Sequence, residues 1–449
     1  MSSRPITLVV IGAGNRGRDT YGRWCLAHPD AARVVAVAER DSARLTAMAD
    51  EHGLGAEAAF ADWRALLARQ RMADAIVVAT PDREHAAPTI AALDAGYDVI
   101  LEKPIAPTPE EVRAVGETAA RTGGSVTVAH VLRHTAFFST LKDLLDEGRI
   151  GELVTIEHAE RIGYWHFAHS FVRGNWRNEA LASPMILAKA CHDLDLVRWL
   201  AGDRCTTVAS FGGLHHFRPE QAPEGALDRC TDGVRRCPAA PQCPFDAVRL
   251  YVERTREVTG WPISVITDDP SPAGRLQALA SGPYGRCVYR CDNDVADHQV
   301  VALEFANGVR ASLTVTGLTA DNTRRITLSG TRGELRGRLD TGEIELRHFL
   351  PAPDAPSASP WDRDALGRSA MRDDERVVLN ATPVPLYDGH GGGDDGFLTD
   401  AIARLAARRD GGTEQARDAR TSLAVSIDSH VMAFAAEESR HQRRMVELR

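Results

Sequence analysis

The chain has 449 residues, 43% of them hydrophobic and 26% charged, and a formal net charge of -9. This length exceeds one typical hydrophobic core and predicts two domains. The acidic balance, without a basic run interleaved with aromatic residues, argues against a nucleic-acid partner. No stretch approaches the roughly 20 apolar residues of a membrane helix, and the chain enters its first strand without a cleavable leader. We therefore expect a cytoplasmic protein with no membrane partner, whose eight cysteines are reduced.

The first predicted strand, residues 6–11, ends in a glycine-rich turn. Gly12, Gly14 and Gly17 have the G-x-G-x-x-G spacing of a strand that turns into a helix beside a bound dinucleotide. Gly12 permits the tight turn, Gly14 lets a pyrophosphate approach the backbone, and Gly17 lets the helix pack closely on the strand. Because glycine-rich turns without ligands are common, this interpretation needs support from the later strands.

The second predicted strand, residues 33–38, ends at Glu39, about where an acidic residue binds the adenosine ribose of a dinucleotide. The carboxylate favours NAD because it would repel a 2′-phosphate, whereas the adjacent Arg40 leaves NADP open. Further apolar strands at 73–80, 98–102 and 125–130 alternate with helices. This alternation predicts a parallel, doubly wound sheet over residues 1–130.

Two of these strands end in polar loops, Thr80-Pro81 and Glu102-Lys103-Pro104. Open α/β sheets hold their ligands at the carboxyl ends of the strands, so Lys103 is a candidate for a site beside the cofactor. The alternative is a solvated loop lysine. The proline after Lys103 could form a cis peptide bond, which loops adopt only rarely.

The order of these motifs, with His85 after Thr80-Pro81, resembles the Gfo/Idh/MocA family, which includes glucose–fructose oxidoreductase and inositol dehydrogenase. The resemblance implies an α/β protein: an N-terminal Rossmann domain, then over residues 131–449 an α/β domain with an open, mainly antiparallel sheet that covers the nicotinamide and joins homo-oligomers. Lys103 matches the family's active-site lysine. The cofactor-binding residues are then Gly12, Gly14, Asn15, Arg16, Gly17, Glu39, Arg40, Thr80, Pro81, His85, Glu102 and Lys103.

A stretch rich in polar aromatic residues lies after the expected strand at 153–160. His166, His169, Arg173 and Trp176 suit a polyhydroxylated ligand, because rings can cover the C–H face of a sugar while polar groups reach its hydroxyls. A mobile surface loop is the alternative.

Residues 185–200 are predicted to form one helix on which Lys189, His192 and Asp193 share a face. Such a cluster is costly to bury without a function. His192 matches the family's active-site histidine. Where the family usually has an aspartate four residues earlier, this chain has Ala188, so Lys189 or Asp193 is expected to take over part of that role.

Cys230, Cys237 and Cys243 lie close together in a proline-rich loop. In a reducing compartment they could bind zinc through their thiolates, with Cys191, Cys205 or a histidine as the fourth ligand. The alternative is a reduced loop packed by its cysteines.

Residues 351–395 are expected to be irregular, with His390 as a candidate to approach the substrate, and a helix at 415–440 is expected to pack back on the Rossmann domain. These features together predict an NAD(P)-dependent dehydrogenase that acts on a secondary hydroxyl of a sugar, cyclitol or glycoside. His192 would be the acid/base, and Lys103 would polarise the oxygen. An NAD-dependent glycoside hydrolase, which oxidises the sugar only transiently, and a non-catalytic nucleotide sensor are the alternatives.

Overall fold

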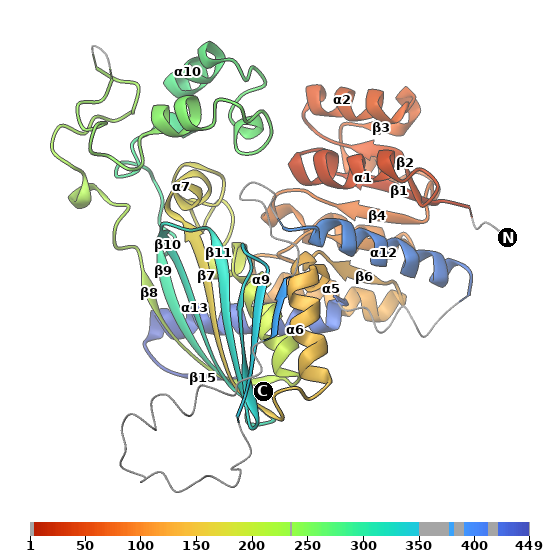
Figure 1. Ribbon diagram of the computed structural model, residues 1–449. Helices are drawn as coiled ribbons and strands as arrows, with labels where there is room; N and C mark the ends of the chain where they lie inside the picture. The colour runs from red at the N-terminus through yellow and green to blue at the C-terminus, as the bar shows by residue number, and fades with distance from the viewer. Residues whose placement is uncertain (1–3, 234–235, 350–376, 381–389, 412–420, 449) are drawn as a thin grey trace, which may run out of the picture.

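The computed structural model describes residues 4–233, 236–349, 377–380, 390–411 and 421–448. The N-terminal part contains a six-stranded parallel sheet in the order β3-β2-β1-β4-β5-β6. Its strands are β1 (Ile6–Ile11), β2 (Ala32–Ala38), β3 (Ala59–Phe60), β4 (Ala75–Val78), β5 (Asp98–Leu101) and β6 (Val126–Val128). The α-helices between them are α1 (Arg23–Ala27), α2 (Ser42–His52), α3 (Trp63–Leu67), α4 (Ala86–Asp94) and α5 (Pro109–Thr122). The predicted Rossmann fold is confirmed (Figure 1).

The burial of strand β4 shows that both faces of this sheet are covered by other parts of the chain. All four of its residues are buried, so side chains that point to opposite faces both meet apolar neighbours. Two separate hydrophobic clusters, one on each face, contain Ile76 and Val77 respectively. The continuous apolar runs in the sequence therefore correspond to central parallel strands.

The second part is built on a nine-stranded sheet in the order β14-β13-β12-β11-β7-β10-β9-β8-β15. The β7–β10 pair is parallel, and the other described pairs in this sheet are antiparallel, which confirms the open, mainly antiparallel sheet. The strands are β7 (Leu153–Gly163), β8 (Cys205–Gly213), β9 (His298–Phe305), β10 (Arg310–Thr319), β11 (Thr323–Gly330), β12 (Gly333–Arg338), β13 (Glu343–His348), β14 (Val377–Asn380) and β15 (Val446–Glu447).

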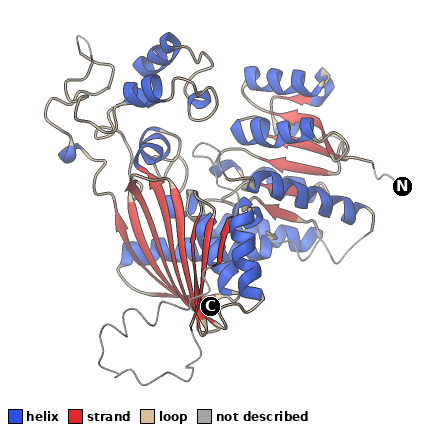
Figure 2. Cartoon of the chain, viewed as in Figure 1, coloured by secondary structure: helices blue, strands red, loops and turns tan. Residues whose placement is uncertain are grey.

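Helices α6 (Ala136–Asp146), α9 (Cys191–Ala201) and α13 (Leu423–Gln442) contribute to the hydrophobic core on one side of this sheet (Figure 2). Along β9 buried and exposed residues alternate, as expected for a sheet with one solvated face. A smaller lobe beyond the sheet contains π-helix η7 (Arg249–Arg254) and α10 (Pro272–Ser281), which have a core of their own around Tyr251 and Leu279.

The C-terminal segment ties the two parts together. Helix α12 (Gly393–Arg409) places Phe397 and Leu398 in the core that contains β1. Helix α13 runs from the sheet of the second part towards α5 (Figure 1), with Leu423 in the Rossmann core and Met432 in the core of the second part. None of the helices among the described residues is both long and apolar enough to cross a membrane.

Two expectations about secondary structure are wrong in part. The helix expected at 185–200 is broken: α8 (Met185–Ala188) ends before Lys189, and α9 begins at Cys191. The break leaves the Ala188 carbonyl to accept a hydrogen bond from Lys103 Nζ at 3.0 Å, so a tertiary contact replaces a helical one. In the segment expected to be irregular, residues 377–380 form strand β14, which pairs with β13. Residues 351–376 and 381–389 of that segment lie outside the described residues, and so do residues 415–420 of the expected last helix.

Candidate active site

The turn after β1 has the shape that a dinucleotide requires. Gly12 has a φ of 95°, and a Cβ there would lie 2.6 Å from the Ala79 carbonyl oxygen. A Cβ on Gly17 would lie 1.8 Å from the Gly12 oxygen, whereas one on Gly14 would meet no described atom within 4 Å. Close backbone contacts therefore exclude a side chain at Gly12 and at Gly17. The space beside Gly14 is open, at the start of π-helix η1 (Asn15–Gly22). This turn fits a bound pyrophosphate.

Glu39 lies at the end of β2, half-buried beside this turn. Its carboxylate accepts hydrogen bonds from the Ala13 and Asp41 amides at 2.7 and 2.9 Å, which fix it at the position expected for a ribose-binding acid. Arg40 points to Glu84 instead, in an exposed pair at 2.9 Å. The local charge around the ribose position is therefore dominated by the Glu39 carboxylate.

His85 acts as a buried connector between the two polar loops. Its Nδ1 lies 2.6 Å from the Pro104 oxygen and its Nε2 lies 2.8 Å from the Thr80 oxygen, so the ring joins the loops after β4 and β5. Both ring nitrogens are thereby engaged by the protein, and the contribution of His85 to the site is to hold Thr80-Pro81 beside Lys103-Pro104.

Glu102 and Arg16, both expected at the cofactor, bind each other. Arg16 Nε donates to Glu102 at 2.5 Å, and Tyr21 donates to the same carboxylate oxygen at 2.7 Å. Burial opposes ionisation of Glu102, but the charges of Arg16 and Lys103 prevail and hold its pKa below the usual range. Arg16 also donates to Asp394 at 2.6 Å, so this chain of charges connects the Rossmann sheet with α12.

Lys103 reaches from the carboxyl end of β5 into the second part of the molecule. Besides donating to the Ala188 oxygen, its Nζ lies 5.9 Å from the centre of the Trp176 ring, and the peptide bond to Pro104 is cis. The Trp176 indole donates to Asp82 at 3.2 Å, which fixes the ring against the Rossmann domain. The contacts with Ala188 and Trp176 therefore hold the lysine at the junction of the two parts.

His192 and its neighbour His130 are buried histidines near Lys103 whose ring nitrogens have no hydrogen-bond partner among the described residues. His192 is 3% exposed. The rings of His130 and His390 lie 5.7 and 5.6 Å away. Burial above all, followed by the positive charge of Lys103, lowers the pKa of His192 well below its usual value. The imidazole is therefore neutral and can accept a hydrogen bond from a hydroxyl, whereas burial and Lys103 both oppose its protonation.

Asp193, the next residue, is fully engaged. It is completely buried, and its carboxylate accepts from His158 Nε2 at 2.8 Å and from Arg324 Nε at 2.8 Å. These contacts direct Asp193 towards the sheet, whereas His192, the preceding residue of α9, lies beside His130 and His390. The geometry therefore gives Asp193 a structural position, and the expectation that it takes over part of the role of the family's aspartate stays a prediction.

Lys189 lies in the break between α8 and α9, with its Nζ 3.5 Å from Oε1 of Glu160, in the C-terminal half of β7. Burial lowers the pKa of Lys189 and raises that of Glu160, and in each case burial outweighs the attraction between the two groups. The pair is therefore poised to share a proton. Glu160 and Arg324, which sequence reasoning missed, come from separate strands; only the position of Glu160 at the end of an expected strand could have suggested it.

Part of the expected substrate stretch forms an aromatic wall. His166 Nδ1 lies 3.0 Å from Asn322 Oδ1, and its ring is 5.0 Å from that of Trp261. His169 is 2% exposed, lies 3.0 Å from the Tyr251 hydroxyl, and stacks on Tyr284. Burial, with a smaller contribution from Arg173, lowers the pKa of His169 to about 3. His166 is thus the more accessible of the two histidines.

His390 lies at the start of α12, with its Nδ1 3.0 Å from Asp394 Oδ2 and its ring beside that of His192. The structure therefore brings together His390, His192 and, through Asp394, Arg16 of the Rossmann domain. The spacing of His390 and Asp394, one helical turn apart, was the signal in the sequence that could have identified the second residue.

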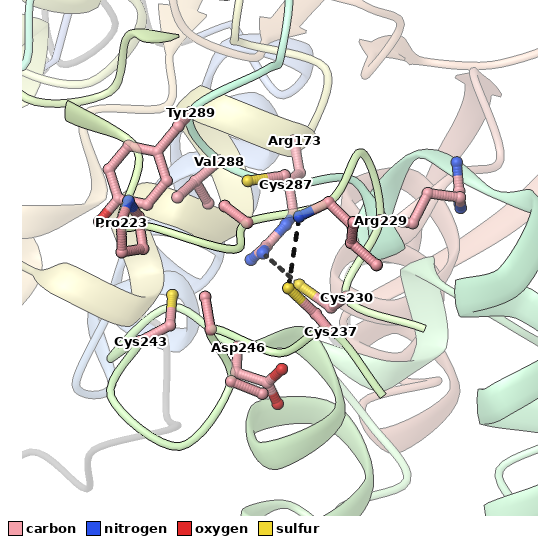
Figure 3. A pocket seen from close by; sticks show the side chains of 14 residues that line it. Arg173, Pro223, Arg229, Cys230, Cys237, Cys243, Asp246, Cys287, Val288 and Tyr289 are labelled. Carbon is pink, nitrogen blue, oxygen red and sulfur yellow. Dashed lines mark hydrogen bonds between the residues drawn. The ribbon is translucent and has the colours of Figure 1, made fainter. Parts of the chain in front are cut away.

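Arg173 and the cysteines lie apart from this site. Cys230, Cys237 and Cys243 line a small cavity, but its fourth cysteine is Cys287, and neither Cys191 nor Cys205 is part of the lining (Figure 3). Arg173, expected to contact the substrate, points to this cavity and donates to Cys230 Sγ at 3.6 Å. The fourth cysteine at this loop is thus Cys287, 44 residues after Cys243, in place of Cys191 or Cys205, and zinc binding stays a prediction.

A glycine turn on a parallel sheet, facing a lysine and a neutral histidine across a domain junction, defines a nicotinamide-dependent oxidoreductase. Residues 6–130 match the model described as "Oxidoreductase family, NAD-binding Rossmann fold", and residues 142–351 match "Oxidoreductase family, C-terminal alpha/beta domain". The chain belongs to the Gfo/Idh/MocA family of oxidoreductases.

Curated relatives include the putative oxidoreductase YteT of Bacillus subtilis, which is 26% identical over 73% of this chain and 71% of its own length. Inositol 2-dehydrogenase of Streptomyces avermitilis is 30% identical over 50% of this chain and 61% of its own length. The alignments with YteT and with the inositol dehydrogenase thus cover well over half of each relative, but not its whole length.

Solved structures show the same fold over nearly the whole chain. Levoglucosan dehydrogenase, in complex with NADH and L-sorbose, has a TM-score of 0.66 at 19% identity and covers 99% of both chains. The WlbA dehydrogenase of Bordetella pertussis, in complex with NADH and UDP-GlcNAcA, has a TM-score of 0.63 at 19% identity and covers 100% of this chain and 99% of its own.

Proposed function

We propose that the protein is an NAD-dependent dehydrogenase that oxidises a secondary hydroxyl of a sugar, cyclitol or glycoside. The observation that carries this proposal is His192, a buried imidazole beside Lys103 whose nitrogens have no hydrogen-bond partner in the described part of the chain. The names of the inositol dehydrogenase relatives and the sugar ligands of the structural neighbours support the substrate class.

In this proposal the turn at Gly12 to Gly17 and Glu39 would hold NAD, which would supply the acceptor for the hydride of the substrate carbon. His192 takes the hydroxyl proton, for which it must lie within hydrogen-bond reach of the substrate oxygen. Lys103 turns from the Ala188 carbonyl to the same oxygen and stabilises the negative charge that develops there. The Lys189–Glu160 pair, 3.5 Å apart at the break between α8 and α9, is the candidate to pass the proton onward.

The aromatic wall supports a polyhydroxylated substrate. Trp261 offers an apolar ring face, while His166 and Asn322 supply polar groups next to it. Glu39 supports NAD over NADP, since its fixed carboxylate would lie where the additional phosphate has to bind.

The experiment that tests the proposal is an assay of the purified chain against a panel of sugars, cyclitols and glycosides with NAD and with NADP. We expect reduction of NAD, seen as nicotinamide absorbance, with at least one member of the panel, and loss of that activity in His192→Asn. Cofactor binding measured by calorimetry without any turnover on the panel, and an unchanged response in the Lys103→Met, His192→Asn double variant, would instead favour a nucleotide sensor.

A glycoside hydrolase of the same fold is the second candidate, and Glu160 is the observation that favours it. Burial raises the pKa of this carboxyl, which is the direction that a proton donor to a leaving group requires. Net turnover would then release an aglycone without a lasting change in nicotinamide absorbance. A chromogenic glycoside assayed beside the dehydrogenase panel separates the two reactions.

We also propose that the open sheet face joins copies of the chain. Phe211 on β8 is 71% exposed and lies directly opposite Val300 on β9, which is 45% exposed. An adjacent pair of large apolar side chains on a flat sheet is suited to a self-association interface. Light scattering of the wild-type chain and of Phe211→Lys tests this: a dimer or larger assembly that dissociates in the variant is expected, and a monomeric wild type contradicts it.

A further inference from the structure

A glycine-rich run before helix α12 places a second histidine against His192. Gly392, the N-cap of α12, has a φ of 77°, a conformation that favours glycine. A Cβ on Gly393 would lie 2.6 Å from the Val131 carbonyl oxygen, so a larger residue could not begin the helix this close to the Rossmann domain. The ring of His390, which precedes this run, lies 5.6 Å from that of His192. The glycines thus account for the approach of His390 to the proposed active site.

Asp394 fixes the tautomer of the His390 ring. The two residues are four positions apart, and His390 Nδ1 lies 3.0 Å from Asp394 Oδ2. Burial opposes ionisation of Asp394, but His390 and Arg16 hold the pKa of this carboxyl well below its usual range. Because an ionised carboxylate can only accept hydrogen bonds, Nδ1 of His390 carries the hydrogen. In the neutral ring, Nε2 therefore keeps a lone pair that can accept a proton.

Arg16 holds the Asp394 carboxylate in this orientation. Its Nη2 donates to Asp394 Oδ1 at 2.6 Å, which is the oxygen that His390 does not use, and its Nε donates to Glu102. Arg16 belongs to the glycine turn of the proposed cofactor site, and Glu102 directly precedes Lys103. The His390–Asp394 pair, although it comes from the C-terminal segment, is therefore tied to the residues around Lys103.

The two neighbouring rings differ in how well they can hold a proton. Burial and the charge of Lys103 lower the pKa of His192, and no carboxylate binds its ring among the described residues. Burial also lowers the pKa of His390, but Asp394 acts in the opposite direction. In addition, 23% of the His390 side chain is exposed, whereas His192 is buried. The other charged groups that act on the His390 ring are Arg16 and Lys189, and both lower its pKa.

We propose that His390 receives, on its Nε2, the proton that His192 takes from the substrate hydroxyl, and that Asp394 positions His390 for this step. The inference rests on the proposed function. The proton leaves His192, which becomes neutral again, and makes His390 an imidazolium paired with the Asp394 carboxylate. It then passes to water, while the hydrogen on Nδ1 stays in place. Neighbouring rings can exchange a proton directly or through one water.

The Lys189–Glu160 pair is the competing acceptor for this proton. Its two groups lie 3.5 Å apart, and the Glu160 side chain is only 3% exposed. A proton that reaches this pair is therefore enclosed, whereas the exposed part of His390 offers a way to solvent. Charge balance favours the same choice, because Glu160 also pairs with Arg324 at 2.9 Å, while the Asp394 carboxylate is directly bonded to the ring that would become a cation.

The first test is the turnover of His390→Ala with NAD and the member of the panel that the wild type oxidises. We expect kcat to fall at least about tenfold, less than for loss of the base itself, with KM and the affinity for NAD unchanged. Added imidazole should restore part of kcat, because a small base can replace an exposed ring. A merely structural histidine would not be rescued in this way. Wild-type kcat in His390→Ala, or a low kcat that imidazole does not raise, overturns the proposal.

Two neighbouring aspartates provide a matched pair of variants. Asp394→Asn keeps an oxygen that can accept from Nδ1 but removes the charge, so it should lower kcat in the same direction as His390→Ala. Asp395→Asn, at the next and exposed position, should keep the wild-type kcat. Equal kcat values in the two variants contradict the role of Asp394. If Lys189→Met lowers kcat and His390→Ala does not, the proton passes through the Lys189–Glu160 pair instead.

The tautomer and the charge effect can be measured without turnover. In the full chain with ¹³C-labelled histidine, the ring signal of His390 is the one missing from His390→Ala. Its titration should move down by at least about one pH unit in Asp394→Asn, because an adjacent opposite charge favours the protonated ring by this order, and should stay in place in Asp395→Asn. An unchanged titration in Asp394→Asn overturns the His390–Asp394 pair.

The outcomes also separate this inference from the proposed function. If His192→Asn loses turnover while His390→Ala and Asp394→Asn keep it, the proton transfer to His390 is wrong and the dehydrogenase proposal stands. If the wild-type chain oxidises no member of the panel although the His390 signal shifts in Asp394→Asn, the proposed function fails. The proton transfer then fails with it, and only the assignment of the tautomer remains.

Discussion

Helix α9 carries two adjacent buried polar residues with opposite surroundings. On the side towards Lys103, the His192 ring has no hydrogen-bond partner among the described residues, while on the side towards the sheet the Asp193 carboxylate is bound by His158 and Arg324. Leaving a buried polar group unpaired costs roughly 1–3 kcal/mol, whereas a fully paired group costs little. The contrast indicates that His192 is kept for a ligand and that Asp193 holds the helix on the sheet.

The substitution His192→Asn is the most direct test of this difference between His192 and Asp193. If the imidazole is the base, turnover should fall about a hundredfold to ten-thousandfold, the usual contribution of a general base. NAD affinity by calorimetry and the melting temperature should change little, because the ring makes no hydrogen bond to the described part of the chain that the variant could lose.

Lys189→Met is the matched variant for this prediction, because its Nζ is also buried and pairs with Glu160. Both variants should be assayed for hydride transfer and for glycoside cleavage. If His192→Asn keeps both activities while Lys189→Met loses them, the lysine is the base and the assignment of His192 is wrong.

On the sheet side of α9, Asp193→Asn should act on stability. The substitution removes one of two carboxylates that pair with Arg324, because Glu160 Oε2 still lies 2.9 Å from Arg324 Nε. The loss in the free energy of unfolding should therefore lie below the about 3–5 kcal/mol of a fully broken buried pair. Urea denaturation measures this change. Any loss of turnover should follow the loss of folded protein.

Arg325→Gln provides the control, because this neighbour of Arg324 on β11 forms a half-exposed pair with Asp321. Exposed pairs contribute about 0–1 kcal/mol. Equal losses of stability in Asp193→Asn and Arg325→Gln would show that the buried network is not what holds α9 in place.

The surroundings of His192 and Asp193 on α9 also show which features the sequence could predict and which it could not. The turn at Gly12 to Gly17 and the lysine after β5 depend on neighbouring residues, so spacing alone predicted them. The resemblance to the family added His192. Arg324 and Glu160 come from strands far apart in the sequence, and the break at Lys189 is coupled to the bond from Lys103 to Ala188. No local pattern encodes these long-range contacts, so the sequence could not show that His158 and Arg324 engage Asp193.

A smaller effect is expected at the cofactor end of the site. Glu39→Gln removes the carboxylate charge but keeps an oxygen that can accept from the Ala13 amide. Loss of one repulsive charge near a 2′-phosphate is worth about 1–2 kcal/mol at partly solvated positions, so the preference for NAD over NADP should shrink roughly tenfold. Calorimetry with both cofactors measures it.

Glu84→Gln, at the exposed partner of Arg40, is the control for this variant. It should leave the preference nearly unchanged. Tight NADP binding with NAD excluded in the wild-type chain would contradict the role of Glu39 altogether.

We expect the smallest effect for pH, because turnover should change little between about pH 7 and 8. Burial and the charge of Lys103 lower the pKa of His192, so the imidazole should remain neutral below the usual histidine pKa of about 6.5. A base must be unprotonated to act, and activity should therefore stay nearly flat through neutrality and fall only as pH drops through the lowered value.

The stability of the fold must be measured at the same pH values as the rate, because the burial of histidines also makes folding depend on pH. Burial also lowers the pKa of His130, and it lowers that of His430 to about 3, so the unfolded chain binds more protons than the folded chain below about pH 6.5. The stability that these groups contribute is present above that pH and is lost as the pH falls further. Rates of the wild type and of His192→Asn should thus be compared only where circular dichroism shows both to be folded.

Within that range, the acid limb of the rate profile decides which group titrates. An acid limb centred near neutral pH, absent from His192→Asn, would show that substrate or cofactor restores an ordinary histidine pKa, because a bound anion or an oxygen that accepts from the ring offsets the cost of burial. An acid limb that remains in His192→Asn would assign the titrating group to another residue. The Lys189–Glu160 pair is then the first to examine, since its two groups are buried 3.5 Å apart and both titrate away from their usual pKa values.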